Sequence, residues 1–184
     1  MRKLTACVRD RASLDAGDAE RMYALFARYY TGGSAATFER DLAGKTHVIE
    51  LREAAVLRGF STLAVFERES GGVRTRGIYS GDTIIDHERW GEQALPLAFC
   101  RFAGQVWAQA PSIPLYWMLI SKGHRTYRYL QLFAHDYHPH ATVQTAPGLR
   151  RLADALYAER FGADYDAACG LVRFAATGRT RLRP

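Results

Sequence analysis

The stretch Val73–Asp86, VRTRGIYSGDTIID, leads into the loop HERWGEQ at 87–93 and then into a helical apolar pattern at 94–110. Its β-branched and aromatic residues predict a strand, which Gly77 and Gly81 interrupt. A strand that enters a helix through a tight loop leaves the first N–H groups of that helix free for an anion such as a phosphate. The same pattern also fits an ordinary strand-to-helix connection, so other parts of the sequence must decide between the two interpretations.

The run 94–110 has the spacing of an amphipathic helix. Pro96 falls in its first turn, where no backbone hydrogen bond is lost, and Pro111 ends it. The predicted apolar face consists of Leu95, Ala98, Phe99, Phe102, Val106 and Trp107.

The remaining segments predict an α+β fold. The strands at 46–51, 59–67 and 73–86 form a meander, and the apolar run at 113–120 is typical of a buried central strand. The order implies a mixed, mostly antiparallel sheet flanked by helices, with one crossover between 73–86 and 113–120. Further elements are expected as a strand at 4–8, a helix from Asp15 or Asp18 to Gly32, a helix at 36–42 that Ser34 caps, a helix at 125–134, and an optional strand at 170–174. A last helix at 147–161 is opened by Pro147 and closed by Gly162.

The composition is that of a globular protein with 184 residues, 48% of them hydrophobic and 24% charged, which fits one domain. No apolar run reaches about 20 residues, and the start MRKLTACVRD lacks the apolar region of a signal peptide. We therefore expect a cytoplasmic protein without a membrane span. The three cysteines form no C-x-x-C pair and the histidines of 135–140 match no ligand spacing, so no metal is expected.

The net charge of +6 is compatible with an acidic partner, such as nucleic acid, a phosphorylated cofactor or an acidic carrier protein. Most of the basic residues are scattered along the chain, however, and no aromatic-basic motif accompanies them. This distribution favours a mildly basic surface over a nucleic-acid-binding face.

The order of elements and the glycine loop resemble the GNAT superfamily, the general acyl-CoA N-acyltransferases, over approximately residues 4–137. The loop of that family reads Q/R-x-x-G-x-G/A. The matching run here keeps Gly91, whereas Glu88 and Gln93 depart from the pattern. The segment 141–184, with one helix and at most one strand, replaces the family's last two strands. The resemblance thus implies one domain over 1–184, with a core at about 4–137 and an atypical C-terminal extension at about 141–184.

The resemblance also implies a function, the transfer of an acyl group from a thioester to a small amine by direct attack in a ternary complex. The donor would be acyl-CoA or an acyl carrier protein. N-acyl amino acid synthases and acyl-homoserine lactone synthases, which have degenerate loops, are the branch to compare first. In this family the loop amides hold the pyrophosphate and the preceding strand meets the pantetheine. The corresponding residues here are Thr83, Ile84, Ile85, Arg89, Trp90, Gly91, Glu92, Gln93 and Ala94.

Gly81 lies within an otherwise good strand, which often marks a β-bulge beside an active site, and the fourth GNAT strand carries such a bulge. The other interpretation is a local distortion that the neighbouring polar residues cap. In the functional interpretation Asp82 is the preferred general base. Ser80 and Tyr79 line the same gap, as a catalytic and a substrate-binding residue respectively.

Glu50 is a second carboxylate on a predicted strand, either part of the site, as a base or a substrate contact, or a solvent-facing residue. The family's acid is a tyrosine near the end of the helix after the fifth strand. Phe133 occupies that position here, which leaves Tyr129, one turn earlier, and Tyr127 as candidates; both also fit a role in packing.

Lys122 and His124 follow the apolar run 113–120 and are expected to contact the substrate. The competing class is a GNAT-like module that binds an acyl carrier or a small ligand without catalysis. The oligomeric state stays open, a homodimer included.

Overall fold

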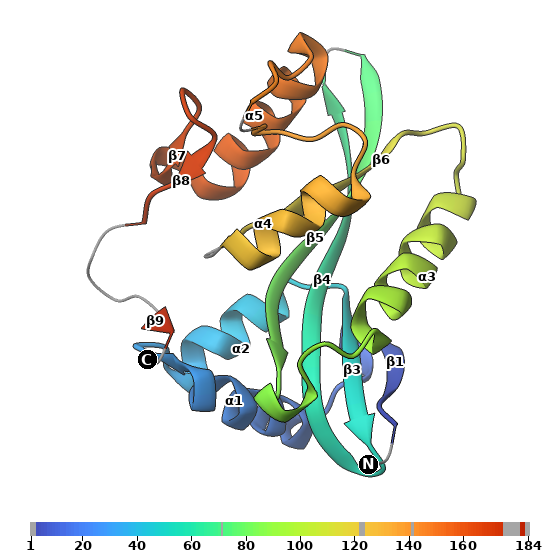
Figure 1. The fold of residues 1–184 in the computed structure, drawn as a ribbon, viewed down its shortest axis with the longest axis vertical. Helices are drawn as coiled ribbons and strands as arrows, with labels where there is room; N and C mark the ends of the chain where they lie inside the picture. Colours follow the sequence, from blue (N-terminus) through green and yellow to red (C-terminus); the bar gives the residue numbers. More distant parts are fainter. Residues whose placement is uncertain (1–2, 71, 122–123, 141, 175–180, 183–184) are drawn as a thin grey trace. The chain divides into compact units, whose positions relative to one another are not determined.

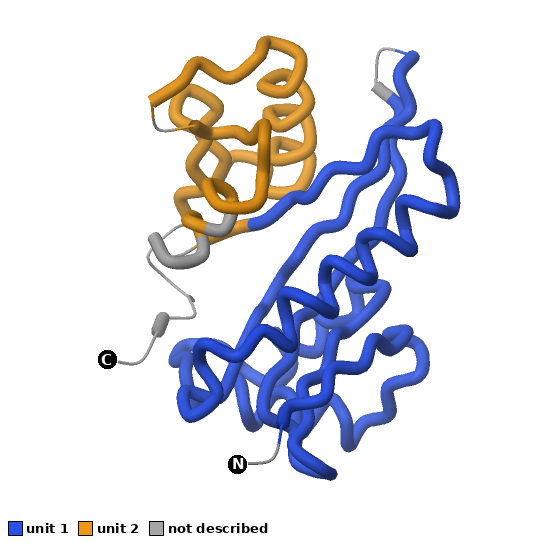
Figure 2. The backbone as a smooth tube through the Cα atoms, turned by 45° about the vertical axis from the view of Figure 1, so that its right-hand side comes forward, with its two compact units in different colours: residues 1–119, 180–184 blue, residues 120–179 orange. Residues whose placement is uncertain are grey.

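The computed structural model describes residues 3–70, 72–121, 124–140, 142–174 and 181–182 (Figure 1). The chain divides into two compact units, residues 1–119 with 180–184 and residues 120–179 (Figure 2). This division falls after Leu119, earlier than the end of the predicted core near residue 137. The assignment of the whole chain to one domain stays a prediction.

The first unit is built on a five-stranded sheet with the order β1-β3-β4-β5-β6. All neighbours are antiparallel except β5 and β6, which are parallel and joined through a helix. The mixed, mostly antiparallel sheet, the meander and the crossover are therefore confirmed. The strands are β1 (Thr5–Asp10), β3 (His47–Glu53), β4 (Val56–Ser70), β5 (Val73–Ile85) and β6 (Leu115–Leu119).

Two helices of the first unit begin where the sequence places their caps. In α1 (Ala16–Tyr29) the Asp15 carboxylate accepts a hydrogen bond from the Asp18 amide at 2.6 Å, and Asp18 reciprocates in a capping box. In α2 (Ala35–Ala43) Ser34 accepts from the Thr37 amide at 3.2 Å. The remaining elements are α3 (Ala94–Ala108), the single turns η1 (Arg11–Ser13) and η2 (His87–Arg89), and the short strands β2 (Tyr30–Thr31) and β9 (Arg181–Leu182), which pair with each other.

Alternating residues of the sheet build two apolar cores, one on each face. On β3, Val48 faces α1 and α2, whereas Ile49 faces α3, and both are fully buried. Burying each large side chain of these cores contributes roughly 1.5–3 kcal/mol. The first core contains Met22, Leu25, Phe26, Phe38, Leu42, Val48, Phe60 and Ile84; the second contains Leu4, Ile49, Leu51, Leu63, Ile78, Phe102 and Val106.

The structure corrects two expectations about apolar residues. The run 113–120 was expected to be a central strand, but β6 lies at the end of the sheet among the described strands, and Trp117 is 37% exposed. A continuous apolar run does not show whether a strand has neighbours on one side or on both. The prediction of a central strand was wrong for this reason. Trp107, predicted on the buried face of α3, is also exposed.

The second unit contains α4 (His124–Phe133) and α5 (Pro147–Phe161), followed by η3 (Gly162–Asp164) and a ribbon of β7 (Tyr165–Asp166) and β8 (Leu171–Val172). Pro147 opens α5 and Gly162, with a φ of 54°, ends it, as the sequence predicts. The Tyr165 hydroxyl donates to Asp154 at 2.6 Å, and its ring stacks on Tyr157. None of the helices within the described ranges is long and apolar enough to cross a membrane.

Gly77 in β5 provides a test of the sheet packing. A Cβ atom at this position would fall inside the van der Waals surface of the Phe66 ring. We expect Gly77→Ala to lower the free energy of unfolding by about 1–3 kcal/mol, because the ring must leave its position. Urea unfolding measures this change.

The matched control is Gly104→Ala in α3, where a Cβ would meet no described heavy atom within 4 Å. Alanine is the better helix former by about 1 kcal/mol, so this variant should be as stable as the wild type or more stable. Equal stability of Gly77→Ala and Gly104→Ala would contradict the packing interpretation.

Candidate active site

The predicted bulge is present in β5. Ser61 pairs with Thr83 and Leu63 pairs with Ser80, so Gly81 and Asp82 together face the single residue Thr62. A Cβ on Gly81 would lie 2.7 Å from both the Lys45 Cε and the Thr62 Oγ1 atoms. The bulge therefore depends on glycine because the side chains beneath it leave no room for another atom.

Beyond the bulge, none of the described strands pairs with β5 on the side away from β4. Its pairing with β6 ends at Ser80–Leu119, whereas β5 itself runs to Ile85. The Asp86 amide donates to the Arg58 carbonyl of β4 at 2.7 Å. By antiparallel alternation, the backbone groups of Thr83 and Ile85 then point away from β4. We call residues 81–85, on the side facing away from β4, the open edge of β5.

The open edge leads into the loop before α3. Gly91 adopts a φ of 91°, which favours glycine over other residues. The first backbone bond of the helix is donated by the Leu97 amide to the Gln93 carbonyl at 3.1 Å, and the Gln93 side chain does not cap the helix. The amides of Ala94 and Leu95 precede this first bond, so they are available to an anion at the positive end of the helix dipole.

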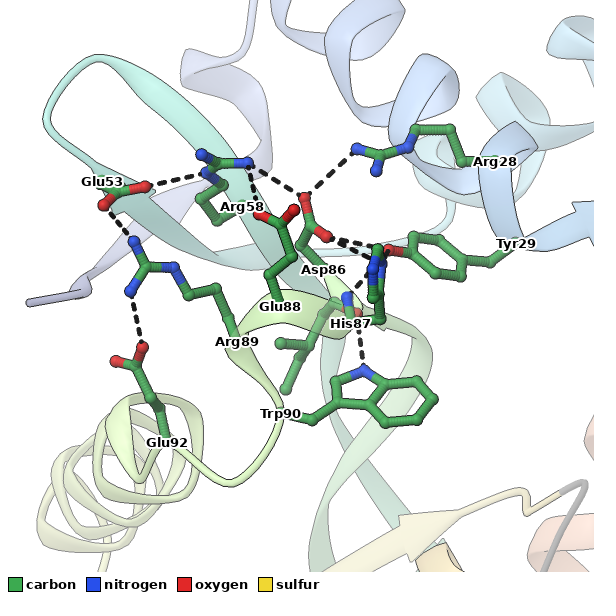
Figure 3. A network of polar contacts seen from close by, with 11 residues as sticks. Arg28, Tyr29, Glu53, Arg58, Asp86, His87, Glu88, Arg89, Trp90 and Glu92 are labelled. Atoms are coloured by element: carbon green, nitrogen blue, oxygen red, sulfur yellow. Dashed lines mark hydrogen bonds and ion pairs between the residues drawn. The ribbon is translucent and has the colours of Figure 1, made fainter. Parts of the chain in front are cut away.

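Arginines compensate the two glutamates of this loop (Figure 3). Arg89, only 5% exposed, forms ion pairs with Glu53 and with Glu92, the latter at 3.1 Å. Glu88 is exposed and lies 3.7 Å from an Arg58 nitrogen. Because the Arg89 guanidinium is buried among carboxylates, it supports the loop rather than facing a ligand.

Trp90 is exposed, and its indole N–H donates to the Ile85 carbonyl at 2.9 Å. This hydrogen bond occupies one of the outward-facing backbone groups of the open edge. The amide and carbonyl of Thr83 and the amide of Ile85 point the same way, and no hydrogen bond joins them to the described part of the chain on that side.

Asp86 is the buried anchor of the loop. It is 1% exposed, and its carboxylate accepts hydrogen bonds from the Tyr29 hydroxyl at 3.1 Å, from Arg28 at 3.3 Å and from Arg58 at 3.2 Å (Figure 3). The Tyr29 hydroxyl in turn accepts from the His87 amide at 2.9 Å. Burial by itself raises the pKa of Asp86, but the Tyr29 hydrogen bond and the arginine charges outweigh it and hold this pKa below the ordinary value.

Tyr30, which the sequence analysis did not single out, lies close to Asp82. Burial and the negative charge of Asp82 both raise the pKa of its phenol, so the phenol is neutral at physiological pH. Its ring stacks on Phe26 with centroids 4.8 Å apart. Only the fold brings these positions together, because 52 residues of sequence separate Tyr30 from Asp82.

The other candidates of the first unit have defined surroundings. The Ser80 hydroxyl accepts from the Trp117 indole at 2.9 Å, and Tyr79 is buried with the Lys45 ammonium 5.6 Å from its ring centre. Glu50 is 2% exposed, so the solvent-facing interpretation of this residue was wrong. Its carboxylate accepts from Arg9 at 3.2 Å and from Arg52 at 2.8 Å, which gives it a structural role.

The candidates from the second half of the chain, Lys122, His124, Tyr127 and Tyr129, belong to the second unit, and their part in the site stays a prediction. The Tyr127 hydroxyl donates to the Pro139 carbonyl within the second unit at 2.8 Å. Lys122 and the side chains of His124 and Tyr129 lie outside the described residues. Among the residues that are described, no group of three histidine, cysteine or acidic side chains could hold a metal ion.

Asp86→Asn tests the anchor of the loop. We expect the free energy of unfolding at pH 7 to fall by about 2–4 kcal/mol, because two arginines lose their buried partner. A carboxyl group with a lowered pKa stabilises the fold above its unfolded pKa of about 3.8, and this contribution is lost as the pH falls through the folded pKa. The difference between wild type and variant should therefore shrink in urea unfolding below pH 4.

The control is Asp10→Asn, whose carboxylate is 77% exposed and should contribute less than about 0.5 kcal/mol. A wild-type advantage over Asp86→Asn that is equally large at pH 7 and pH 3 would show that the charge of Asp86 is not what stabilises the loop.

Comparisons with known proteins give a fold rather than a close relative. No protein-family model matches the sequence, and no curated protein does. The ribosomal-protein-alanine N-acetyltransferase of Brucella melitensis biovar Abortus 2308 aligns with a TM-score of 0.53 at 14% identity, over 78% of this chain and 100% of that one. The aminoglycoside N-acetyltransferase AAC(6')-Iy, in a complex with CoA, aligns with a TM-score of 0.52 at 8% identity, over 79% and 97%.

A probable N-acyltransferase from Enterococcus faecalis V583 aligns with a TM-score of 0.51 at 18% identity, over 69% of this chain and 32% of that one. These structural likenesses, together with the bulge and the crossover helix, confirm the predicted fold: the chain has the fold of the GNAT N-acetyltransferases.

Proposed function

We propose that this protein is an N-acyltransferase that moves an acyl group from acyl-CoA to a small amine. The observation that carries the proposal is the open edge of β5, which begins at the bulge and ends at the loop into α3. The outward-facing amide and carbonyl of Thr83 and the amide of Ile85 suit the amide groups of a pantetheine arm, and the following helix start suits a pyrophosphate. The fold shared with enzymes such as the CoA-bound AAC(6')-Iy supports this assignment.

The order of these features sets the direction of the donor. The pyrophosphate lies at the amides of Ala94 and Leu95, after the strand and the loop with Gly91 have ended. The pantetheine runs back along Thr83 and Ile85, antiparallel to the path of the chain. Residues 81–85 span about 13 Å of strand, so the thioester arrives near the bulge at Gly81 and Asp82.

The groups around the bulge match the needs of direct acyl transfer. An attacking amine must lose a proton, and the Asp82 carboxylate is the base that takes it. Burial and the charge of Asp82 keep the Tyr30 phenol neutral, so that it can donate a hydrogen bond to the acceptor. Because the Ser80 oxygen accepts from Trp117, its own hydrogen can be donated to the thioester carbonyl as negative charge develops there.

The leaving thiolate needs an acid, for which Tyr129 and Tyr127 remain the proposed residues. Lys122 and His124 remain proposed substrate contacts. Within the first unit, Glu50 and Arg89 take structural roles in this scheme because buried ion pairs occupy both side chains.

Several finer assignments belong to the same proposal. An acyl carrier protein is the alternative donor, which the net charge of +6 favours because carrier proteins are acidic. A cytoplasmic location, a homodimer and the kinship with N-acyl amino acid and acyl-homoserine lactone synthases are proposed from the sequence alone. A module that binds an acyl carrier or small ligand without catalysis is the second candidate function, which the departures at Glu88 and Gln93 favour.

Calorimetric titration with acetyl-CoA and free CoA tests the donor site. We expect micromolar dissociation constants for the wild type and at least about tenfold weaker binding for Gly91→Ala, because alanine strains a backbone with a φ of 91°. Gly104→Ala, within α3 and away from the loop, is the matched control and should bind as the wild type does. Absence of wild-type binding to both compounds would refute the acyl-CoA assignment.

Asp82→Asn tests the base. With acetyl-CoA and a panel of small amines, thiol release should fall at least about 10²-fold, because the amine keeps its proton. The dissociation constant for acetyl-CoA should stay within about twofold, since the donor contacts are mainly backbone groups. A loss of turnover below about threefold would remove Asp82 from the role of base, and donor binding without turnover in the wild type would favour the non-catalytic module.

A further inference from the structure

The Trp117 side chain covers the place where the pairing of β5 and β6 ends. It lies on the face of the sheet that α3 covers. The last pair of the two strands is Ser80–Leu119, and Trp117 lies two residues before that end of β6. Its indole N–H reaches diagonally across the strands to the Ser80 hydroxyl at 2.9 Å. Its ring packs on Phe99 of α3, with the ring centroids 4.8 Å apart. The indole thus spans the strands and the helix above them.

The opposite face of the sheet is filled at the same level. Tyr79 and Met118 pair across the strands and are 6% and 4% exposed. The Lys45 side chain, 1% exposed, lies over the Tyr79 ring and is held by an ion pair with Asp41. Side chains therefore occupy both faces of the sheet directly beyond the bulge.

We propose that Trp117 limits the acyl group of the donor to short chains of about two to four carbons. This inference rests on the proposed function, which brings the thioester to the bulge with its acyl carbons directed toward Ser80. At that point the strands are paired, so additional carbons must leave the plane of the sheet. On one face they meet Tyr79 and Lys45, and on the other they meet the Trp117 indole.

Of the three side chains that an acyl chain would meet here, the Trp117 indole is the one that a longer acyl chain can displace. Trp117 is 37% exposed, whereas Tyr79 and Lys45 are buried in the core of the unit. Moving the indole breaks its hydrogen bond to Ser80 and its contact with Phe99. Binding a longer acyl group therefore costs the protein these two interactions, which lowers the affinity. Removing the indole creates a space that apolar carbons can fill.

The test is the dissociation constant of acetyl-CoA, butyryl-CoA and octanoyl-CoA, measured by calorimetry without an acceptor. The wild type should bind octanoyl-CoA at least about tenfold more weakly than acetyl-CoA. Trp117→Ala should bring the two constants to within about threefold of each other or reverse their order. Trp107→Ala, which removes a 52% exposed indole from α3, is the matched control and should keep the wild-type ratio.

Trp117→Phe separates the volume of the side chain from its hydrogen bond. It keeps a ring beside Phe99 and removes only the donor to Ser80, so the preference for short chains should persist. This variant also preserves the test if Trp117→Ala fails to fold. If Trp117→Phe binds butyryl-CoA and octanoyl-CoA equally well, the volume of the side chain is not what limits the acyl group.

The outcomes distinguish the two proposals. Equal wild-type affinity for acetyl-CoA and octanoyl-CoA would overturn the role of Trp117 while leaving the acyl-CoA site in place. An unchanged ratio in a folded Trp117→Ala variant would do the same. Failure of the wild type to bind free CoA as well as all three acyl-CoAs would instead refute the proposed function, and the chain-length inference with it.

Discussion

The extra residue in β5 is the constraint on which the rest of the site depends. Without it, every residue after Ser80 would change faces, because successive side chains in a strand point to opposite sides. The bulge persists because Gly81 leaves room for the buried Lys45 chain and the Thr62 hydroxyl directly beneath it. Lys45 is held in turn by Asp41 at the end of α2. Helix α2, which begins at its cap Ser34, 11 residues before Lys45, thereby fixes the backbone of β5 far along the chain.

A second buried polar group fixes the other end of the open edge. Asp86 joins α1, β4 and the loop before α3 through Tyr29, Arg28 and Arg58. Removing one partner from such a buried network costs more than making it gains, so the network fixes a single conformation of the loop. The open edge between Gly81 and Ile85 therefore lies between two anchored ends. A binding surface made of backbone groups needs this rigidity, because it has no side chains that could adjust.

The sequence predicted the features that local patterns encode. The caps at Asp15 and Ser34, the crossover helix and the bulge at Gly81 follow from residue types and short spacings, and all four are confirmed. The environment of Glu50 did not follow, because Arg9 reaches it from a strand 41 residues away. Tyr30 was missed for the same reason, since its relation to Asp82 arises only when α1 packs on the sheet. Among the described strands β6 is at the end of the sheet. This position depends on which strands follow β6, and an apolar run carries no information about that.

The departures of the loop from the GNAT pattern also have a physical explanation. Glu88 and Glu92 place two negative charges near a proposed phosphate site, yet each lies beside an arginine, Arg58 or Arg89. Both arginines also pair with other carboxylates, Glu53 and Asp86, so they offset the two glutamates only in part. The helix dipole and the backbone amides supply the attraction for an anion at the start of α3. Those amides belong to the backbone and do not depend on the side chains at 88 and 93. The loop favours a glycine at 91, where φ is 91°, and this is the position at which the sequence agrees with the GNAT pattern.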